Sequence, residues 1–489
     1  MNYKMITNNV GKVLRVEAFL MFFPAIVSAV YSEWTAFTVF LSTALASLLI
    51  ATLLVRYVKP DNQYIFAKEG FVTVALAWIT ISLVGALPFV ISGEIPNFVD
   101  ALFETVSGFT TTGASILTNV DNLSHGMLFW RSFTHWIGGM GILVFIMALA
   151  TKNPDRSMHI LRAEMPGPVV DKFLPKAKQT TLILYLIYSA LTVILTIMLL
   201  FGGLDLFESL IYAFGTAGTG GFAPTSAGLT VHSNYVQWVI AIFMLLFGVN
   251  FNLYFLILIG KFSSLIKNTE LWVYLGIVFV AMVTIAINIF SIYQDFWTVV
   301  RQSFFQTSSM ITTTGFATTD FTKWPALSQT ILLLLMFTGA CAGSTAGGFK
   351  ISRIVILFKS VSANLKRVLH PRATTITKLD GKKLDEDTIS GVNSYLLIYL
   401  FVFAIIFLLL FIDPWLAKMS TEEAFATNLS ATFACFNNIG PGLSMVGPMA
   451  NYAMYSPFSK IVLTFAMFLG RLEIYPIILT FSITTWRKK

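Results

Sequence analysis

The sequence predicts an all-α integral membrane protein with two N-terminal helices and four tandem repeats of span, short re-entrant helix and span around a pseudo-fourfold axis. Three observations support this prediction. Apolar residues make up 56% of the 489 residues and charged residues only 11%, which is too little polar surface for a water-soluble protein of this length. Ten apolar windows are long enough to cross a bilayer, and four glycine-rich motifs lie between them.

Each predicted span follows from length and composition. A helix needs about 20 apolar residues to cross the hydrocarbon core of a membrane. The first window lacks a small-residue cleavage site after it, so we interpret it as a retained anchor helix and not a signal peptide. The ten windows are residues 13–31, 35–56, 71–92, 127–150, 180–203, 236–260, 271–292, 328–358, 394–412 and 458–482.

The basic residues predict the orientation of the chain. The net charge of +8 could indicate an anionic partner such as nucleic acid, but 26 of the 32 lysine and arginine residues fall in six connecting segments. By the positive-inside rule these segments are cytoplasmic, so we expect both termini inside a bacterial cytoplasmic membrane and no nucleic-acid partner. The six segments are residues 1–16, 56–70, 150–180, 260–270, 349–390 and 484–489.

Acidic residues mark the opposite side. From residue 70 onward, each pair of spans leaves the cytoplasm and returns, with one short apolar stretch at each outer turn. These stretches, of about 12 to 15 residues, are too short to span and predict re-entrant helices. They cover residues 98–109, 205–216, 297–311 and 422–436. The predicted domains are an N-terminal anchor (1–69) and four repeats (70–155, 156–265, 266–368 and 369–489).

A glycine-rich motif follows each short stretch: SGFTTTGAS at Gly113, FGTAGTGGF at Gly220, SMITTTGFA at Gly315 and ACFNNIGPG at Gly440. Glycine permits dihedral angles that turn carbonyl oxygens toward an axis, where they can replace the water around a cation. One such motif is weak, because small residues also mediate helix packing. Four at equivalent positions predict a pore filter, supplied by Thr111, Thr112, Gly113, Gly218, Thr219, Gly220, Thr313, Thr314, Gly315, Asn438, Ile439 and Gly440.

These repeats and glycines resemble the TrkH family within the superfamily of potassium transporters. The two helices before residue 70 favour this branch over the similar KtrB branch, which lacks them. The resemblance implies a potassium uptake pore with potassium ions bound at the filter residues and no other cofactor. It further implies a homodimer in membrane lipid, gated by a cytosolic nucleotide-binding ring of the TrkA type. We expect the segments 150–180 and 350–383 to contact that ring, because they are the largest inside surfaces.

Two further features fit the resemblance. The glycines Gly339, Gly343, Gly347 and Gly348 each weaken helix by roughly 1 kcal/mol relative to alanine, and the matching family segment is a loop that blocks the pore below the filter. Arg471 lies within an apolar span, where a charge is costly and predicts a pore-facing position. We therefore assign these five residues to a gate. The alternatives are a flexible helix kink for the glycines and a distant structural salt bridge for Arg471.

Other functions have less support. The motifs at 215–221 and 343–350 superficially resemble nucleotide-binding loops, but both lie between membrane spans and neither follows a strand. A secondary transporter with alternating access would need inverted repeats, whereas these repeats are parallel. We find no cluster of nucleophilic, metal-ligating or acid–base residues that would predict an enzyme.

Overall fold

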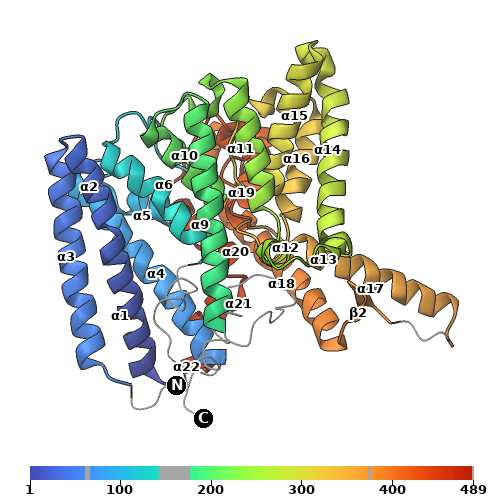
Figure 1. The fold of residues 1–489 in the computed structure, drawn as a ribbon, viewed down its shortest axis with the longest axis horizontal. Helices are drawn as coiled ribbons and strands as arrows, with labels where there is room; N and C mark the ends of the chain where they lie inside the picture. Colours follow the sequence, from blue (N-terminus) through green and yellow to red (C-terminus); the bar gives the residue numbers. More distant parts are fainter. Residues whose placement is uncertain (61–66, 142–176, 373–375, 487–489) are drawn as a thin grey trace.

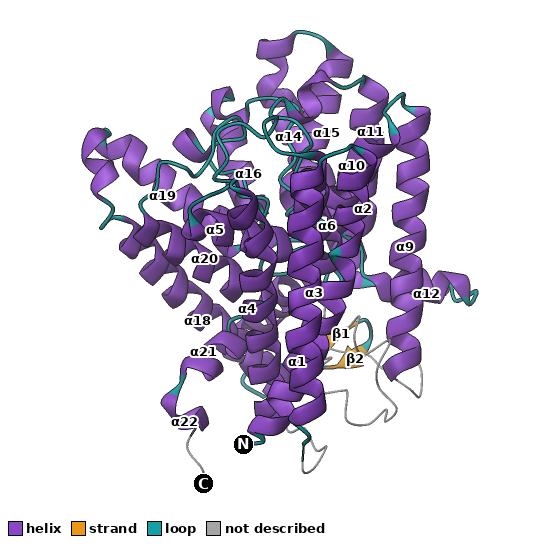
Figure 2. Ribbon diagram, turned by 90° about the vertical axis from the view of Figure 1, so that its left-hand side faces the viewer, coloured by secondary structure: helices purple, strands orange, loops and turns teal. Residues whose placement is uncertain are grey.

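The computed structural model describes residues 1–60, 67–141, 177–372 and 376–486. These residues are predominantly helical (Figures 1 and 2). The strands β1 (Lys378–Leu379) and β2 (Lys382–Lys383) form the single antiparallel pair in the described part of the chain. The start of α1 (Tyr3–Leu20) and the last described helix, α22 (Ile483–Trp486), lie at the same end of the molecule (Figure 1).

Three N-terminal helices stand together at one side of the bundle (Figure 1). They are α1 (Tyr3–Leu20), α2 (Phe22–Val30) and α3 (Trp34–Tyr57), and α1 continues into α2 as one apolar segment of 28 residues. Both α1 and α3 pack against α4 (Ala67–Ser92). The two predicted N-terminal spans are therefore present.

The rest of the chain repeats one order of elements four times: a long helix, a short helix and a second helix that is interrupted or short. The long helices are α4, α9 (Ala177–Phe201), α14 (Thr269–Tyr293) and α18 (Glu386–Leu410). The short helices are α5 (Phe98–Phe109), α10 (Leu206–Gly218), α15 (Phe296–Ile311) and α19 (Thr421–Phe436). The second helices are α6 (His125–Gly139), α11 (Asn234–Phe247), α16 (Ala326–Thr338) and α20 (Pro457–Arg471).

The remaining elements complete the described chain. The helices are α12 (Phe251–Leu258), α13 (Ser263–Ile266), α17 (Ile351–Leu369), α21 (Tyr475–Phe481) and α22 (Ile483–Trp486). The 3-10 turns are η2 (Gly228–Val231), η3 (Phe321–Lys323), η4 (Pro414–Lys418) and η5 (Ser444–Val446). The domain boundaries stay a prediction, and the boundary at 155–156 lies outside the described residues.

The sequence predicted ten spanning helices, with an interruption only in the window 328–358; the described second helices differ from this prediction, because each is short or interrupted. Six helices of the described chain are long and apolar enough to cross a membrane, or seven if α11 and α12 count as one span bent by 88°. The second helices have 13 to 15 residues, about 20 to 23 Å at 1.5 Å per residue, which is less than a hydrocarbon core of about 30 Å. The windows 236–260, 328–358 and 458–482 are each broken, and 127–150 ends among residues that are not described.

The interior of the bundle is polar where the short helices end. Thr110, Thr112, Thr312 and Thr314 are fully buried, as are the serines that precede them in α15. Large apolar side chains instead cover the outer helices, for example Ile287 in α14 and Leu397 in α18. This arrangement suits a protein whose solvent is lipid, because polar groups are then held inside.

Candidate functional site: a ring of four glycine segments

Four short helices deliver the glycine segments. A side chain caps the first turn of each helix: Asn97 before α5, Asp205 before α10, Asp295 before α15 and Ser420 before α19. Each helix ends next to its glycine segment, so the C-terminal ends of four helices face the same region. Aligned peptide dipoles place about half a negative charge at each of these ends, which favours a cation there.

The four segments share one backbone conformation. In each, one N–H group reaches back five residues to a helix carbonyl, at 2.8 or 2.9 Å, and the donors are Thr112, Gly220, Thr314 and Ile439. The residue before each donor and the residue after it have positive φ. Alternation of the sign of φ turns successive carbonyl groups to the same side of the strand, unlike a β-strand, and carbonyls in such an arrangement can replace hydration water.

This conformation corrects the alignment of the second motif by one residue. The equivalent glycines are Gly113 (φ 76°), Gly221 (φ 78°), Gly315 (φ 80°) and Gly440 (φ 98°), whereas the sequence aligned Gly220. Gly218 is the last residue of α10 and lies outside the equivalent triplet. The motif GTGG contains three glycines, and the sequence alone does not show which of them is equivalent to Gly113. The backbone conformation identifies Gly221. The glycine segments are therefore residues 111–113, 219–221, 313–315 and 438–440.

Close backbone contacts join the four segments into a closed ring. A methyl group on Gly113 would overlap the Gly220 carbonyl oxygen, one on Gly221 the Thr314 carbonyl oxygen, and one on Gly315 the Ile439 carbonyl oxygen. A methyl group on Gly440 would lie 2.7 Å from the Thr112 carbonyl oxygen, which returns to the first segment. Each glycine segment thus contacts the next one along the chain, and the fourth contacts the first, as four segments around a shared axis should.

A hollow of about 210 Å³ opens over this ring and is lined by all four equivalent glycines. The residues that line it include no aspartate or glutamate. Acidic residues that the sequence placed at the outer side are engaged elsewhere, for example Asp100 with Lys460 at 2.6 Å and Glu94 with the Ser124 hydroxyl at 2.8 Å. No carboxylate therefore lines this hollow, whose lining includes Arg131, Asn451 and Tyr452 beside the four glycines.

A buried loop lies directly beneath the ring. Helix α16 ends at Thr338 and α17 begins at Ile351, so residues 339–350 form a non-helical intramembrane loop, with positive φ at Gly339, Gly343 and Gly348. The Gly347 N–H donates to the Thr313 hydroxyl of the third glycine segment at 2.6 Å. A methyl group on Gly347 would overlap the Asn437 carbonyl oxygen beside the fourth. Because twelve consecutive residues are non-helical, this segment is a loop and not the helix kink that was the alternative for its glycines.

The loop is also tied to the second repeat. The Cys341 N–H donates to the Gly248 carbonyl at 3.1 Å, and the Phe251 N–H donates to the Gly343 carbonyl at 3.0 Å. The Gly248 carbonyl and the Phe251 N–H lie at the break between α11 and α12, where backbone groups lack hydrogen-bond partners within a helix. The break in the second repeat therefore accommodates the loop of the third.

Arg471 connects the loop to the first repeat. Its guanidinium donates to the Thr345 carbonyl of the loop at 2.8 Å and to the Gly138 and Gly139 carbonyls at the end of α6, both at 2.6 Å. Glu473 forms an ion pair with Arg353 of α17 at 2.5 Å. The sequence predicted a pore-facing arginine. In the structure Arg471, from the fourth repeat, lies below the ring of glycine segments and binds the first and third repeats.

Comparisons with known proteins agree with this geometry. The family model for TrkH, described as a cation transport protein, matches residues 36–488. This chain belongs to the TrkH family. It is 36% identical to the Trk system potassium uptake protein TrkH of Escherichia coli K12 over 100% of both chains, and 32% identical to TrkG of the same organism over 99% of both.

The fold comparison gives the same family. The crystal structure of the potassium transporter TrkH from Vibrio parahaemolyticus superposes with a TM-score of 0.87 and 29% identity over 100% of both chains. The resemblance inferred from the motifs, the all-α class and the multi-pass membrane protein are thereby confirmed.

Side chains that the sequence did not assign brace the ring of this TrkH-family protein. The Phe222 N–H donates to His135 Nε2 at 3.3 Å, and the other ring nitrogen bonds the Gly108 carbonyl at 2.7 Å. The imidazole of His135 is thus neutral, with its proton on Nδ1. His135 therefore connects the first short helix to the chain just after the second glycine segment.

A buried ion pair lies nearby. Arg131 donates to Glu104 at 2.6 Å and to the Ala223 carbonyl at 3.2 Å. Glu104 also accepts from Ser115 and from the Ile116 N–H, both at 2.9 Å. Arg131 is only 4% exposed, so its charge is held inside the protein. The sequence feature that could have predicted this ion pair is the position of Glu104 and Arg131 on either side of the first glycine motif.

The fourth segment replaces threonine with asparagine. The Asn438 amide donates to the Thr112 hydroxyl and to the Met467 carbonyl, both at 2.9 Å. The Tyr452 hydroxyl donates to the Gly440 carbonyl at 2.7 Å, which fixes that oxygen against the protein. The fourth side of the ring is therefore held by side chains that the other three lack.

We expect Glu104→Gln to destabilise the protein substantially, because it leaves the Arg131 charge buried without a counter-ion. Breaking a buried ion pair on one side costs about 3–5 kcal/mol. The change should lower the thermal unfolding midpoint in detergent, while Glu422→Gln, at an exposed position of α19, should leave it within about a degree. Equal midpoints for the two variants would contradict this role.

Proposed function

We propose that this chain takes up potassium ions across a bacterial cytoplasmic membrane through the ring of glycine segments, which acts as its selectivity filter. The observation that supports this most is the closed ring, in which each glycine segment contacts the next and the fourth returns to the first. Packing motifs alone have no reason to close a cycle. The names of the relatives, potassium uptake proteins and a potassium transporter, indicate the same ion.

The filter works by substitution of the hydration shell. Carbonyl oxygens of the four segments replace water around a dehydrated cation, and the four helix ends stabilise the positive charge from behind. The residues we assign are 111–113, 219–221, 313–315 and 438–440. Alternating access would need two halves of inverted topology, whereas a single ring of parallel repeats conducts without moving its halves.

The intramembrane loop is the gate in this proposal. It contacts the third glycine segment and adjoins the fourth from below, so an ion that leaves the filter meets buried backbone. The assigned residues are Gly339, Gly343, Gly347 and Gly348 for the loop and Arg471 for its restraint. Opening requires the loop to leave this position.

Regulation by a partner is part of the proposal. The relatives are named as parts of a Trk system, and we infer a homodimer that a cytosolic nucleotide-binding ring controls. Of the expected docking segment, Lys350 and Arg353 are buried, while Lys366 and Arg367 of α17 are exposed. Helix α17 extends away from the bundle (Figure 1). Most of the segment 150–180 lies outside the described residues. A nucleotide response of the purified chain alone would contradict this inference.

Growth of an uptake-deficient bacterial strain tests the function. Expression of this chain should restore growth at limiting potassium and should increase uptake of the potassium analogue rubidium, with a clear preference over sodium. Expression of a chain that carries a bulky residue at Gly113 is the matched control and should not restore growth. Sodium uptake equal to rubidium uptake, or rescue by the control, would overturn the proposal.

A further inference from the structure

Glu270 binds both ends of the intramembrane loop with one oxygen. It is the second residue of α14, and its Oε1 atom accepts from the Ala342 N–H at 2.7 Å and from the Ser352 N–H at 3.0 Å. Ala342 lies near the start of the loop and Ser352 just after its end. A single side chain from another helix thus holds the loop on both flanks.

The surroundings make these bonds strong. Glu270 is 6% exposed, and Cys341, Thr345 and Lys350 in the loop are almost fully buried. A low dielectric strengthens hydrogen bonds, and a buried N–H group that loses its acceptor costs about 1–3 kcal/mol. The Lys350 side chain donates to the Ala346 carbonyl within the loop.

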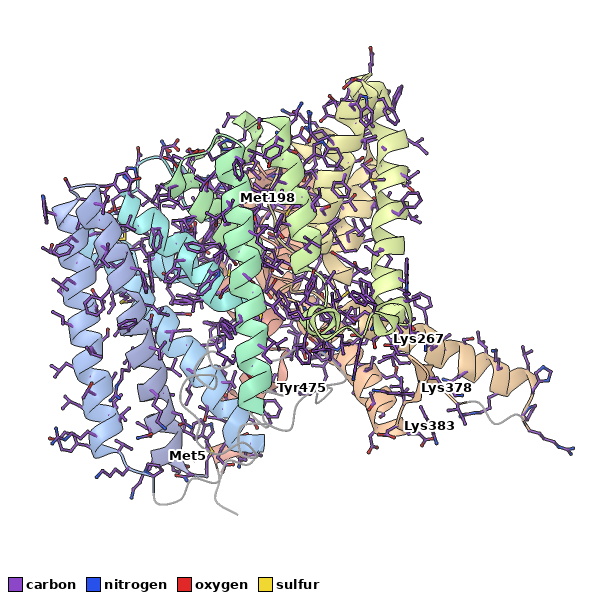
Figure 3. All side chains as sticks on the ribbon, in the orientation of Figure 1. Met5, Met198, Lys267, Lys378, Lys383 and Tyr475 are labelled. Atoms are coloured by element: carbon purple, nitrogen blue, oxygen red, sulfur yellow. The ribbon has the colours of Figure 1, made fainter. Side chains whose placement is uncertain are left out.

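The residue before Glu270 is bound by the cytosolic hairpin. Asp380, in the turn between β1 and β2, accepts from the Thr269 N–H at 2.8 Å and from the Asn268 side chain at 3.2 Å. Lys267, Lys378 and Lys383 lie in the same region (Figure 3). The base of the hairpin is packed through Leu384 against Ile356 of α17 and Val392 of α18.

We propose that Glu270 is a positioning residue that latches the intramembrane loop in its blocking position, and that the β1–β2 hairpin acts on this latch through Asp380 and the first turn of α14. The inference rests on the gate assigned under the proposed function. A movement of the hairpin would shift the N-terminus of α14, and with it the one carboxylate that binds both flanks. In this proposal a movement of the β1–β2 hairpin therefore releases the loop.

The chain's own cysteines provide a direct test. Cys341 lies in the loop and is 1% exposed, while Cys435 in α19 is 0% exposed, and both are free thiols. In the full-length chain in liposomes, Glu270→Ala should raise the rate of maleimide labelling at Cys341 about tenfold, as expected for loss of two buried hydrogen bonds. Labelling at Cys435, read in the same sample by mass spectrometry, should not change.

Further variants separate the latch from a folding defect. Glu270→Gln keeps an acceptor oxygen and should give a smaller increase than alanine. Asp380→Ala should also speed Cys341 labelling, whereas Asp387→Ala, an exposed acidic residue of α18, should not. Because both contacts act in series, the double variant Glu270→Ala/Asp380→Ala should label little faster than Glu270→Ala alone. Equal acceleration at Cys435 would indicate general unfolding and would overturn the reading.

Labelling that is unchanged in Glu270→Ala would overturn the latch. Labelling of the double variant at the product of the two single effects would overturn its link to the hairpin. These outcomes are independent of ion flux, so a latch that fails can be distinguished from a chain that does not conduct potassium.

Discussion

Alanine at Gly113 or Gly221 should reduce rubidium uptake by at least about tenfold, and alanine at Gly93 should leave it unchanged. All three glycines have a similar positive φ, of 76°, 78° and 80°, so each variant has comparable backbone strain of about 1–3 kcal/mol. The new methyl group would overlap a neighbouring carbonyl oxygen at the first two positions, but nothing lies within 4 Å of it at Gly93. Only the filter variants therefore push a carbonyl out of the ring.

Isotope uptake into cells, with the amount of membrane protein measured in parallel, checks this prediction. The variants should also lose preference for potassium over sodium, because selectivity depends on the carbonyl positions. A similar loss of uptake at Gly93 would assign the effect to backbone strain alone. Normal uptake and selectivity in both filter variants would refute the ring as the ion path.

Local features of the sequence located the short helices well. The predicted stretches 98–109, 205–216, 297–311 and 422–436 agree with α5, α10, α15 and α19 to within two residues, because each is an apolar run between a capping side chain and a glycine. The break at residues 339–350 was also predictable, since four glycines in ten residues disfavour helix. These features depend only on neighbours in the chain.

Contacts between distant residues were not predictable in the same way. The second glycine segment was misaligned because GTGG has several possible registers, and the contact with Thr314 chooses Gly221. The breaks after α11 and α20 have no strong local signal: the first exchanges backbone hydrogen bonds with the loop, and the second directly follows Arg471. Glu270 was counted only as part of a cytoplasmic linker, because its partners lie 72 and 82 residues away.

Arg471→Ala should raise resting potassium flux by about tenfold or more, because the loop then loses its connection to the first repeat. The guanidinium binds one carbonyl of the loop and two at the end of α6, and hydrogen bonds to a charged group contribute about 1.5–3 kcal/mol each. Arg471 of the fourth repeat thus ties the loop to the first repeat. Rubidium flux in liposomes, without any cytosolic partner, measures the change.

Arg471→Lys distinguishes a restraint from an electrostatic barrier. Lysine keeps the positive charge, but its compact ammonium lacks the fork of donors that reaches carbonyls on two repeats. If the arginine mainly repels cations, the lysine variant should remain as closed as the wild type; if it mainly restrains the loop, flux should rise toward that of alanine. We expect the rise, because the bonds to Thr345, Gly138 and Gly139 all go to backbone carbonyls on two different repeats. Arg56→Ala, an exposed residue at the end of α3, controls for loss of one charge, and an alanine variant of Arg471 that stays closed would remove this residue from the gate.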